Sequence, residues 1–102
     1  MSDIAEIDLD EIYTYIAEVL MVPITAWHQI EHIRDAVQSL DEMPERGTLL
    51  QDEPWRSRGL RQVFIDNYVI IYDIHKQSFT VTVIAIIYSR RNIGDFLSFE
   101  GR

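Results

Sequence analysis

The spacing of apolar residues changes once along this chain of 102 residues, and that change restricts the fold more than any other feature. Up to about residue 41, apolar residues recur at steps of three and four, which is the spacing of one face of an α-helix. After residue 59 the sequence is rich in Val, Ile, Phe, Tyr and Thr, which suit a pleated sheet. Helical and strand patterns that follow one another in this way predict a single α+β domain over residues 1–102.

The first half predicts two helices joined by a very short link. The first helix has a stripe formed by Ala5, Leu9, Ile12, Ile16 and Leu20. Asp3 with Glu6 fits a capping box at its start. Pro23 marks the start of the second helix, which runs to about residue 41 with the stripe Trp27, Ile30, Ile33, Val37 and Leu40. Because only Met21 and Val22 lie between them, we expect an antiparallel helical hairpin.

The second half predicts a loop and then an antiparallel meander. Residues 41–59 are interrupted by prolines and glycines among charged residues, which predicts an exposed, mobile loop. Strands are expected at Leu60–Ile65, Tyr68–Ile74 and Phe79–Tyr88, with turns at Asp66-Asn67 and His75–Ser78. The run Ile84–Ile87 is apolar at every position, as in a covered central strand. A short helical turn through Phe96-Leu97 is expected near the end.

Composition excludes several classes of protein. The chain has no cysteine, which rules out disulfides, zinc thiolate sites and cysteine nucleophiles. Its apolar runs are far shorter than the roughly 18 residues that a membrane-spanning helix needs. No basic and then apolar leader opens the sequence, so we expect a cytoplasmic protein that is not exported.

The formal net charge of −8 would repel nucleic acid, but the charge is divided unevenly. Residues 1–53 hold 13 acidic and 2 basic residues, whereas residues 54–102 hold 4 acidic and 7 basic residues. Five arginines fall in two short clusters, which are Arg56, Arg58 and Arg61 near the start of the sheet half and Arg90 and Arg91 after the last strand. If the last strand lies centrally, both clusters border one groove that suits phosphate or carboxylate. Alternatively, these arginines only keep the surface soluble.

Other candidate sites have simpler explanations. His28 and His32 fit the H-x-x-E-H pattern of inverted zincins and share a helix face. Ile30 and Ile33 mark the buried stripe, however, so both histidines are expected near the solvated face, and we predict no metal and no cofactor. The acidic residues of the first helix are read as a solvated face rather than a cation site. The strand tyrosines Tyr68, Tyr72 and Tyr88 either stack on bases or belong to the core with the hydroxyl at its edge.

In order and spacing the chain resembles the RelE/ParE superfamily, the toxins of type II toxin–antitoxin (plasmid stabilisation) modules. The resemblance rests on the segments Asp8–Ile16, Pro44 to Gly47, Gly59–Arg61, Asn67–Tyr72 and Ile84–Ile93. It implies a small α+β toxin that is neutralised by an antitoxin whose C-terminal segment wraps over it. Within the superfamily, RelE-like members cleave mRNA on the ribosome and ParE-like members inhibit DNA gyrase.

Compared with the RNase pattern, two residues differ. The arginine expected after the tyrosine of the second strand is Val69, and the tyrosine expected near the C-terminus falls at Leu97. Without an arginine to bind the phosphate and a group to transfer a proton, the chain lacks the groups that phosphodiester cleavage needs. The resemblance therefore favours the ParE-like branch. The residues expected to bind target or antitoxin are then Arg56, Arg58, Arg61, Tyr68, Arg90 and Arg91. The alternatives are a RelE-like endoribonuclease that uses Arg61, Arg90 or Arg91, and a degenerate member that is not toxic.

A further departure concerns the start of the chain. Members of the superfamily usually begin with a β-strand, whereas only Met1–Ile4 precede the helical pattern here. Either the true start of the protein lies upstream or this strand is absent. If it is absent, one sheet edge is left unpaired, and such edges recruit partners. We expect an antitoxin strand, or a second copy of the chain in a homodimer, to fill that edge.

Overall fold

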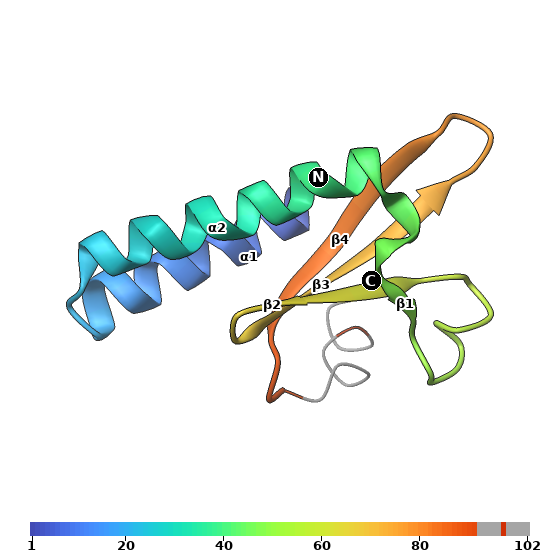
Figure 1. Ribbon diagram of the computed structural model, residues 1–102. Coiled ribbons are helices and arrows are strands. Elements are labelled where there is room, and N and C mark those ends of the chain that lie inside the picture. The colour runs from blue at the N-terminus through green and yellow to red at the C-terminus, as the bar shows by residue number, and fades with distance from the viewer. Residues whose placement is uncertain (92–96, 98–102) are drawn as a thin grey trace.

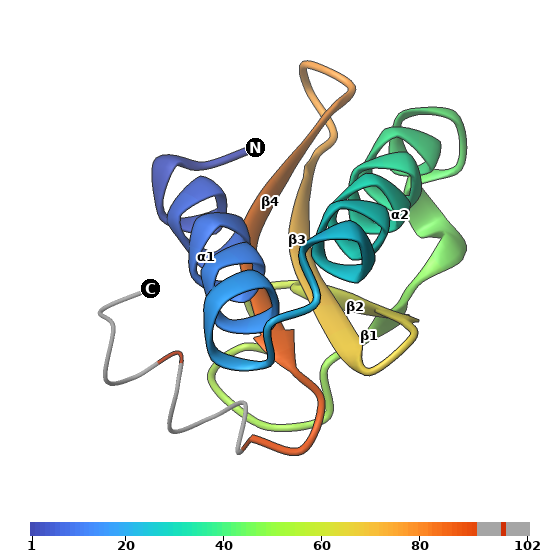
Figure 2. The same cartoon turned by 90° about the vertical axis from the view of Figure 1, so that its left-hand side faces the viewer.

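The computed structural model describes residues 1–91 and Leu97 (Figure 1). Its elements are α1 (Asp3–Thr14), the π-helical turn η1 (Tyr15–Val19), α2 (Pro23–Glu42), the 3-10 turn η2 (Pro44–Arg46), β1 (Thr48–Leu49), β2 (Arg61–Ile65), β3 (Tyr68–His75) and β4 (Thr80–Tyr88). The strands form one antiparallel sheet in the order β1-β2-β3-β4. Both helices lie side by side on one face of this sheet (Figures 1 and 2). The predicted α+β fold, a helical hairpin on an antiparallel meander, is confirmed.

The start of α1 differs from the predicted capping box. The N-cap is Ser2, whose hydroxyl accepts a hydrogen bond from the Ala5 backbone N–H at 3.1 Å. Asp3 is already the first helical residue, and the Glu6 carboxylate instead forms an ion pair with Arg34 of α2 at 3.2 Å. The start of α2 at Pro23 is confirmed.

The predicted apolar stripes are correct over the sheet and wrong at the tip of the hairpin. Leu9, Ile33 and Leu40 are buried, but Leu20 is 53% exposed and Trp27 is 56% exposed. The hairpin is displaced along the sheet, so its tip projects past the sheet (Figure 1). Residues at the tip therefore keep the helical spacing of a core face without any sheet to cover them.

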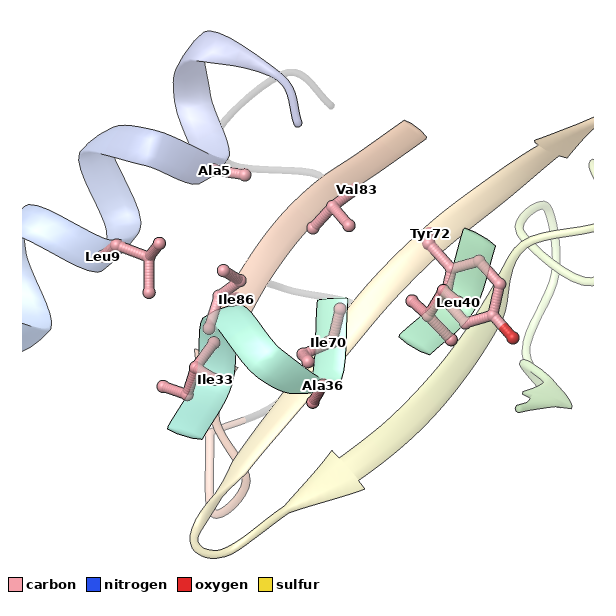
Figure 3. Close-up of a cluster of buried hydrophobic side chains, with 9 residues drawn as sticks. All are labelled: Ala5, Leu9, Ile33, Ala36, Leu40, Ile70, Tyr72, Val83 and Ile86. Carbon is pink, nitrogen blue, oxygen red and sulfur yellow. The ribbon is translucent and has the colours of Figure 1, made fainter. Parts of the chain in front are cut away.

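The main core lies between the hairpin and the sheet. It consists of Ala5, Leu9, Ile33, Ala36, Leu40, Ile70, Tyr72, Val83 and Ile86 (Figure 3). Each large apolar side chain removed from water here stabilises the fold by about 1.5–3 kcal/mol. This cluster joins both helices to the two longest strands, so it holds the two layers together.

A second core covers the opposite face of the sheet. Its buried members are Leu50, Trp55, Leu60, Val69, Ile71, Ala85, Ile87 and Leu97. The expectation of an exposed loop over residues 41–59 is therefore wrong at Leu50 and Trp55, and Thr48–Leu49 additionally pairs with β2 as the short strand β1. The reason is that this face of β3 and β4 is itself apolar, and the large apolar side chains of the segment cover it.

The strand β4 is an outer strand of the described sheet and not the central strand predicted from its apolar run. It is apolar from Ile84 to Ile87 because both faces of the sheet are covered. A register shift contributes as well, because Ile71 pairs with Ala85 while Tyr72 pairs with Val83, which leaves Ile84 as an extra residue in a bulge.

The outer edge of β4 is partly closed by the N-terminal part of the chain. The Ser2 backbone N–H donates to Val83 O at 2.9 Å, and the Ile86 N–H donates to the Asp8 carboxylate at 3.0 Å. Asp8 is only 5% exposed, and among the residues described by the structure it is the one buried charged side chain. The expectation of an unpaired edge is thus wrong at the centre of β4, where Ser2 and Asp8 supply the partners.

The first hairpin turn is confirmed and the second is displaced. Asp66 adopts a positive φ of 53°, as a tight turn at Asp66-Asn67 requires. His75 still belongs to β3, so the second turn occupies residues 76–79 and ends at Phe79 with a φ of 54°. Of the helical turn expected through Phe96-Leu97, Phe96 lies outside the described residues. Over the same part of the chain, neither helix is both long and apolar enough to cross a membrane.

Candidate functional site

The two predicted arginine clusters lie at opposite ends of β2. Arg61 begins this strand, whereas the Ser89 N–H, next to Arg90, donates to Asn67 O in the turn beyond its other end at 2.8 Å. A strand of five residues separates them by about 15 Å. Because β4 is also not a central strand of the described sheet, the arrangement under which one groove was expected between the clusters is not met.

Arg61 has a structural contact that the sequence pattern did not indicate. Its Nη1 donates to Gly47 O at 2.8 Å. The hydroxyl of Tyr72, a fully buried residue, donates to Pro44 O at 2.7 Å and accepts from the Gly47 N–H at 2.9 Å. Together these bonds fix the turn after α2 against the sheet, and Tyr72 has the predicted core position with its hydroxyl at the edge.

The remaining arginines of the predicted set are exposed. Arg56 and Arg58 lie in the segment that leads into β2, and Arg90 and Arg91 lie in the turn after β4. That turn is closed by a hydrogen bond from the Arg91 N–H to Tyr88 O at 3.0 Å. Of the two groups, the Arg90 and Arg91 pair is the one that shares an end of the sheet with Tyr68.

Tyr68 and Tyr88 form an aromatic pair at that end. They face each other across β3 and β4, with ring centroids 6.0 Å apart in an edge-to-face arrangement. Burial raises the pKa of the Tyr68 hydroxyl above its ordinary value, and the phenols of Tyr88 and Tyr15 add to the shift. Tyr68 therefore stays protonated at neutral pH, where it can donate a hydrogen bond but not act as a base.

The two positions that depart from the RNase pattern are both in the second core. Val69 and Leu97 are fully buried and belong to the same apolar cluster. A guanidinium or a phenol at either position would point into that cluster, because the backbone directs these side chains away from solvent. The two departures from the RNase pattern therefore lie in the same buried apolar cluster.

The histidines of the H-x-x-E-H segment have different partners. His32 Nδ1 lies 2.7 Å from the Asp66 carboxylate, which also accepts a bond from the Gln29 side-chain amide at 3.0 Å. The His28 ring instead packs edge-to-face against Trp27, with centroids 5.3 Å apart. Within residues 1–91 and Leu97, no group of three or more His, Cys, Asp or Glu side chains is placed to hold a metal ion.

The contact between α2 and the first hairpin turn depends on the charge of Asp66. The Gln29 amide holds the pKa of the Asp66 carboxyl below its ordinary value; slight burial opposes this, and His32 adds to the lowering. A carboxyl with a lowered pKa stabilises the fold above its unfolded pKa, and this contribution is lost as pH falls through the folded pKa.

We expect Asp66→Asn to reduce the free energy of unfolding by less than about 1 kcal/mol at neutral pH, since Asp66 is 42% exposed. Asparagine tolerates the positive φ at this turn, so the variant tests charge and not backbone strain. The difference in melting temperature from the wild type should shrink below about pH 4 and vanish once the carboxyl is protonated. A difference that stays constant through this range would contradict the assignment.

Sequence reasoning missed one surface, at the tip of the helical hairpin. Large apolar side chains are exposed there, namely Val19, Leu20, Met21, Val22, Ile24 and Trp27. The available signal was the link itself, because a solvated turn between helices is ordinarily polar and this one is not. The tip lies at the end of the hairpin that projects past the sheet (Figures 1 and 2).

A helical hairpin on a four-stranded antiparallel sheet is an α+β fold consistent with the toxins of the RelE/ParE superfamily. Residues 1–93 match the family described as the ParE toxin of the type II toxin–antitoxin system parDE, and the chain belongs to this family. Comparison with curated proteins found no match.

Proposed function

We propose that this chain arrests bacterial growth by binding DNA gyrase and is held inactive by a cognate antitoxin. Membership of the ParE toxin family supports the proposal at the level of a type II toxin. A gyrase inhibitor acts by binding a protein, which needs complementary surfaces and no assembled catalytic set. The proposal places the chain in the cytoplasm, where gyrase acts on DNA.

The observation that carries the choice of target is the burial of Val69 and Leu97. Cleavage of RNA needs a cation to stabilise the phosphate and a group to transfer a proton. Arg61, which the RNase alternative would use, already donates to Gly47 O. The exposed arginines after β4 suit binding to a carboxylate-rich protein surface as well as to phosphate.

The edge of β4 restricts where a strand of the antitoxin can pair with the sheet. A strand added along its centre would have to displace the bonds that Ser2 and Asp8 make to Val83 O and Ile86 N. The same holds for a second copy of the chain. We therefore propose that the antitoxin binds chiefly through side-chain contacts on the helical hairpin, with strand pairing restricted to the ends of β4.

The experiment is to induce the chain alone in bacteria and then to assay the purified protein. Growth should stop on induction and resume when the gene for the antitoxin is expressed with it. In vitro, the protein should inhibit gyrase-dependent supercoiling of relaxed plasmid and leave mRNA on ribosomes intact. Cleavage of that mRNA would assign the chain to the RelE-like activity, and harmless induction without any co-purifying partner would refute the toxin proposal.

Arg90→Ala combined with Arg91→Ala should abolish growth inhibition while the circular dichroism spectrum and melting temperature stay close to those of the wild type. Both side chains are exposed, so their removal should change stability by no more than about 0.5 kcal/mol. The matched control is Arg46→Ala combined with Lys76→Ala, which removes the same charge at the other end of the fold. If the Arg90 and Arg91 double variant remains as toxic as this control, the arginine pair is not the target-binding site.

A further inference from the structure

The proposed function assigns no role to two histidines that lie one helical turn apart. His28 and His32 are exposed on α2, four residues apart, so they share a face of the helix with Cβ atoms about 5–6 Å from each other. Two imidazole nitrogens bound to one ion at about 2.0–2.1 Å lie roughly 3 Å apart, which such side chains can reach. The spacing therefore suits a metal ion held by two ligands.

The structure adds a contact that the sequence pattern lacks. His32 Nδ1 lies 2.7 Å from the carboxylate of Asp66, in the turn between β2 and β3 beneath α2 (Figure 1). An ionised carboxylate only accepts hydrogen bonds, so Nδ1 carries the proton and Nε2 keeps its lone pair. The Gln29 amide donates to the same carboxylate at 3.0 Å and fixes its position. Metal-binding histidines are ordinarily oriented in this way, by a carboxylate on the second ring nitrogen.

Charge and ligand number restrict which ions fit. Asp66 and the exposed Glu31 bring negative charge to this segment, in a chain with a formal net charge of −8. Among residues 1–91 and Leu97, no third His, Cys, Asp or Glu side chain is placed to join the two histidines, so water fills the other positions. Imidazole suits late first-row ions such as Cu²⁺, Ni²⁺ and Zn²⁺, whereas Mg²⁺ and Ca²⁺ prefer oxygen ligands.

From this combination we infer that His28 and His32 bind a divalent transition-metal ion, with Asp66 as a positioning residue. The sequence predicted no metal because both histidines lie on the solvated face. That exposure argues against a closed enzyme site and is compatible with an open site of two ligands. The ion binds the folded chain more tightly than the unfolded one, since only the helix holds the two rings one turn apart. The site does not depend on gyrase as the target.

Trp27 reports on the site because its ring centroid lies 5.3 Å from that of His28. The chain has one other tryptophan, Trp55, which is 9% exposed and belongs to the second core. On the purified, untagged chain, Cu²⁺ should quench the tryptophan emission and saturate at one ion per chain, whereas Mg²⁺ should not. Zn²⁺ should bind more weakly than Cu²⁺ and restore the emission by displacing it in excess. Trp27→Phe, which leaves only Trp55, should lose most of the quenching.

Variants then locate the ligands. His28→Ala and His32→Ala should each weaken Zn²⁺ binding by at least about tenfold in calorimetry. The matched control is His75→Ala, which removes the third histidine of the chain from β3 and should leave the affinity unchanged. All three residues are exposed, so circular dichroism should show the same fold in each variant. Excess Zn²⁺ should raise the melting temperature of the wild type and of His75→Ala, but not of His28→Ala combined with His32→Ala.

Asp66→Gly tests the positioning role, because glycine tolerates the φ of 53° and removes the acceptor. It should weaken Zn²⁺ binding by about tenfold. Asp66→Asn should restore most of the affinity, since its amide oxygen still accepts from His32 Nδ1. A merely structural role would lower the melting temperature of Asp66→Gly and leave the Zn²⁺ affinity of the folded chain unchanged.

Two outcomes would overturn the inference. The first is the same Zn²⁺ affinity in His28→Ala combined with His32→Ala as in His75→Ala. The second is a wild-type melting temperature that Zn²⁺ does not raise. Because every measurement uses metal ions and the purified chain, a failure here is distinct from a failure of growth inhibition or gyrase inhibition.

Discussion

Replacing Gly47 with alanine is expected to lower the free energy of unfolding by about 2–4 kcal/mol, because a Cβ at this position has no space. It would lie 2.5 Å from Gln62 O and 2.7 Å from the Tyr72 hydroxyl. Conformation is not the obstacle, since the φ of −79° and ψ of 169° at Gly47 suit any residue. The turn would have to move away from the sheet, which disrupts the bonds that Tyr72 and Arg61 make to it.

Gly59→Ala is the matched control for this prediction. Gly59 has a φ of 81°, but nothing lies within 4 Å of a Cβ built there. The same chemical change should therefore cost about 1 kcal/mol through backbone strain alone. Thermal and urea unfolding of the two variants should show a melting temperature roughly 10–20 °C below wild type for Gly47→Ala and a smaller decrease for Gly59→Ala. A decrease for Gly47→Ala no larger than that for Gly59→Ala would show that the turn is not held as described.

The second large effect is expected at Asp8. Removing its carboxylate leaves the Ile86 N–H without that acceptor at a buried position of the β4 edge. A hydrogen bond to a charged group contributes about 1.5–3 kcal/mol, so Asp8→Ala should lower the free energy of unfolding by about this amount. Asp8→Asn should cost less, because its amide oxygen can still accept the bond.

Asp10→Ala provides the comparison within the same helix. Asp10 is exposed, and its loss should change stability by no more than about 0.5 kcal/mol. Hydrogen exchange gives a local readout, since the Ile86 amide should exchange faster in Asp8→Ala than in Asp10→Ala relative to the core amides of β3. Equal exchange at Ile86 in both variants would argue against Asp8 as the group that closes the edge.

The local sequence predicted what depends on local chemistry. Pro23 marked the start of α2 because its fixed φ and missing N–H are tolerated only in a first turn. Asp66-Asn67 predicted a tight turn because both residues tolerate positive φ. The change of apolar spacing from helical to strand-like predicted two layers and their order along the chain, and these predictions agree with the structure.

Predictions that needed knowledge of distant neighbours were less successful. Trp27 has the spacing of a core residue, yet it lies beyond the end of the sheet. The apolar run in β4 reads as a central strand, but its two faces are covered by the hairpin and by the second core while the strand itself is outermost. Arg61 was predicted to bind a target or an antitoxin, and its guanidinium donates a hydrogen bond to Gly47 O. In each case the residue type indicated a buried or a binding position, but the local sequence did not indicate which distant residues surround it.

The sequence by itself therefore determined the two helices, the three longer strands, their order and the family, because periodicity, turn chemistry and residue type act over a few neighbouring positions. Only the tertiary structure decided that Ser2 and Asp8 partly close the edge of β4 and that Val69 and Leu97 share one buried cluster. It also decided that the hairpin projects with an apolar tip. These features depend on where the hairpin lies over the sheet and on contacts between residues far apart in the chain, which no local pattern encodes.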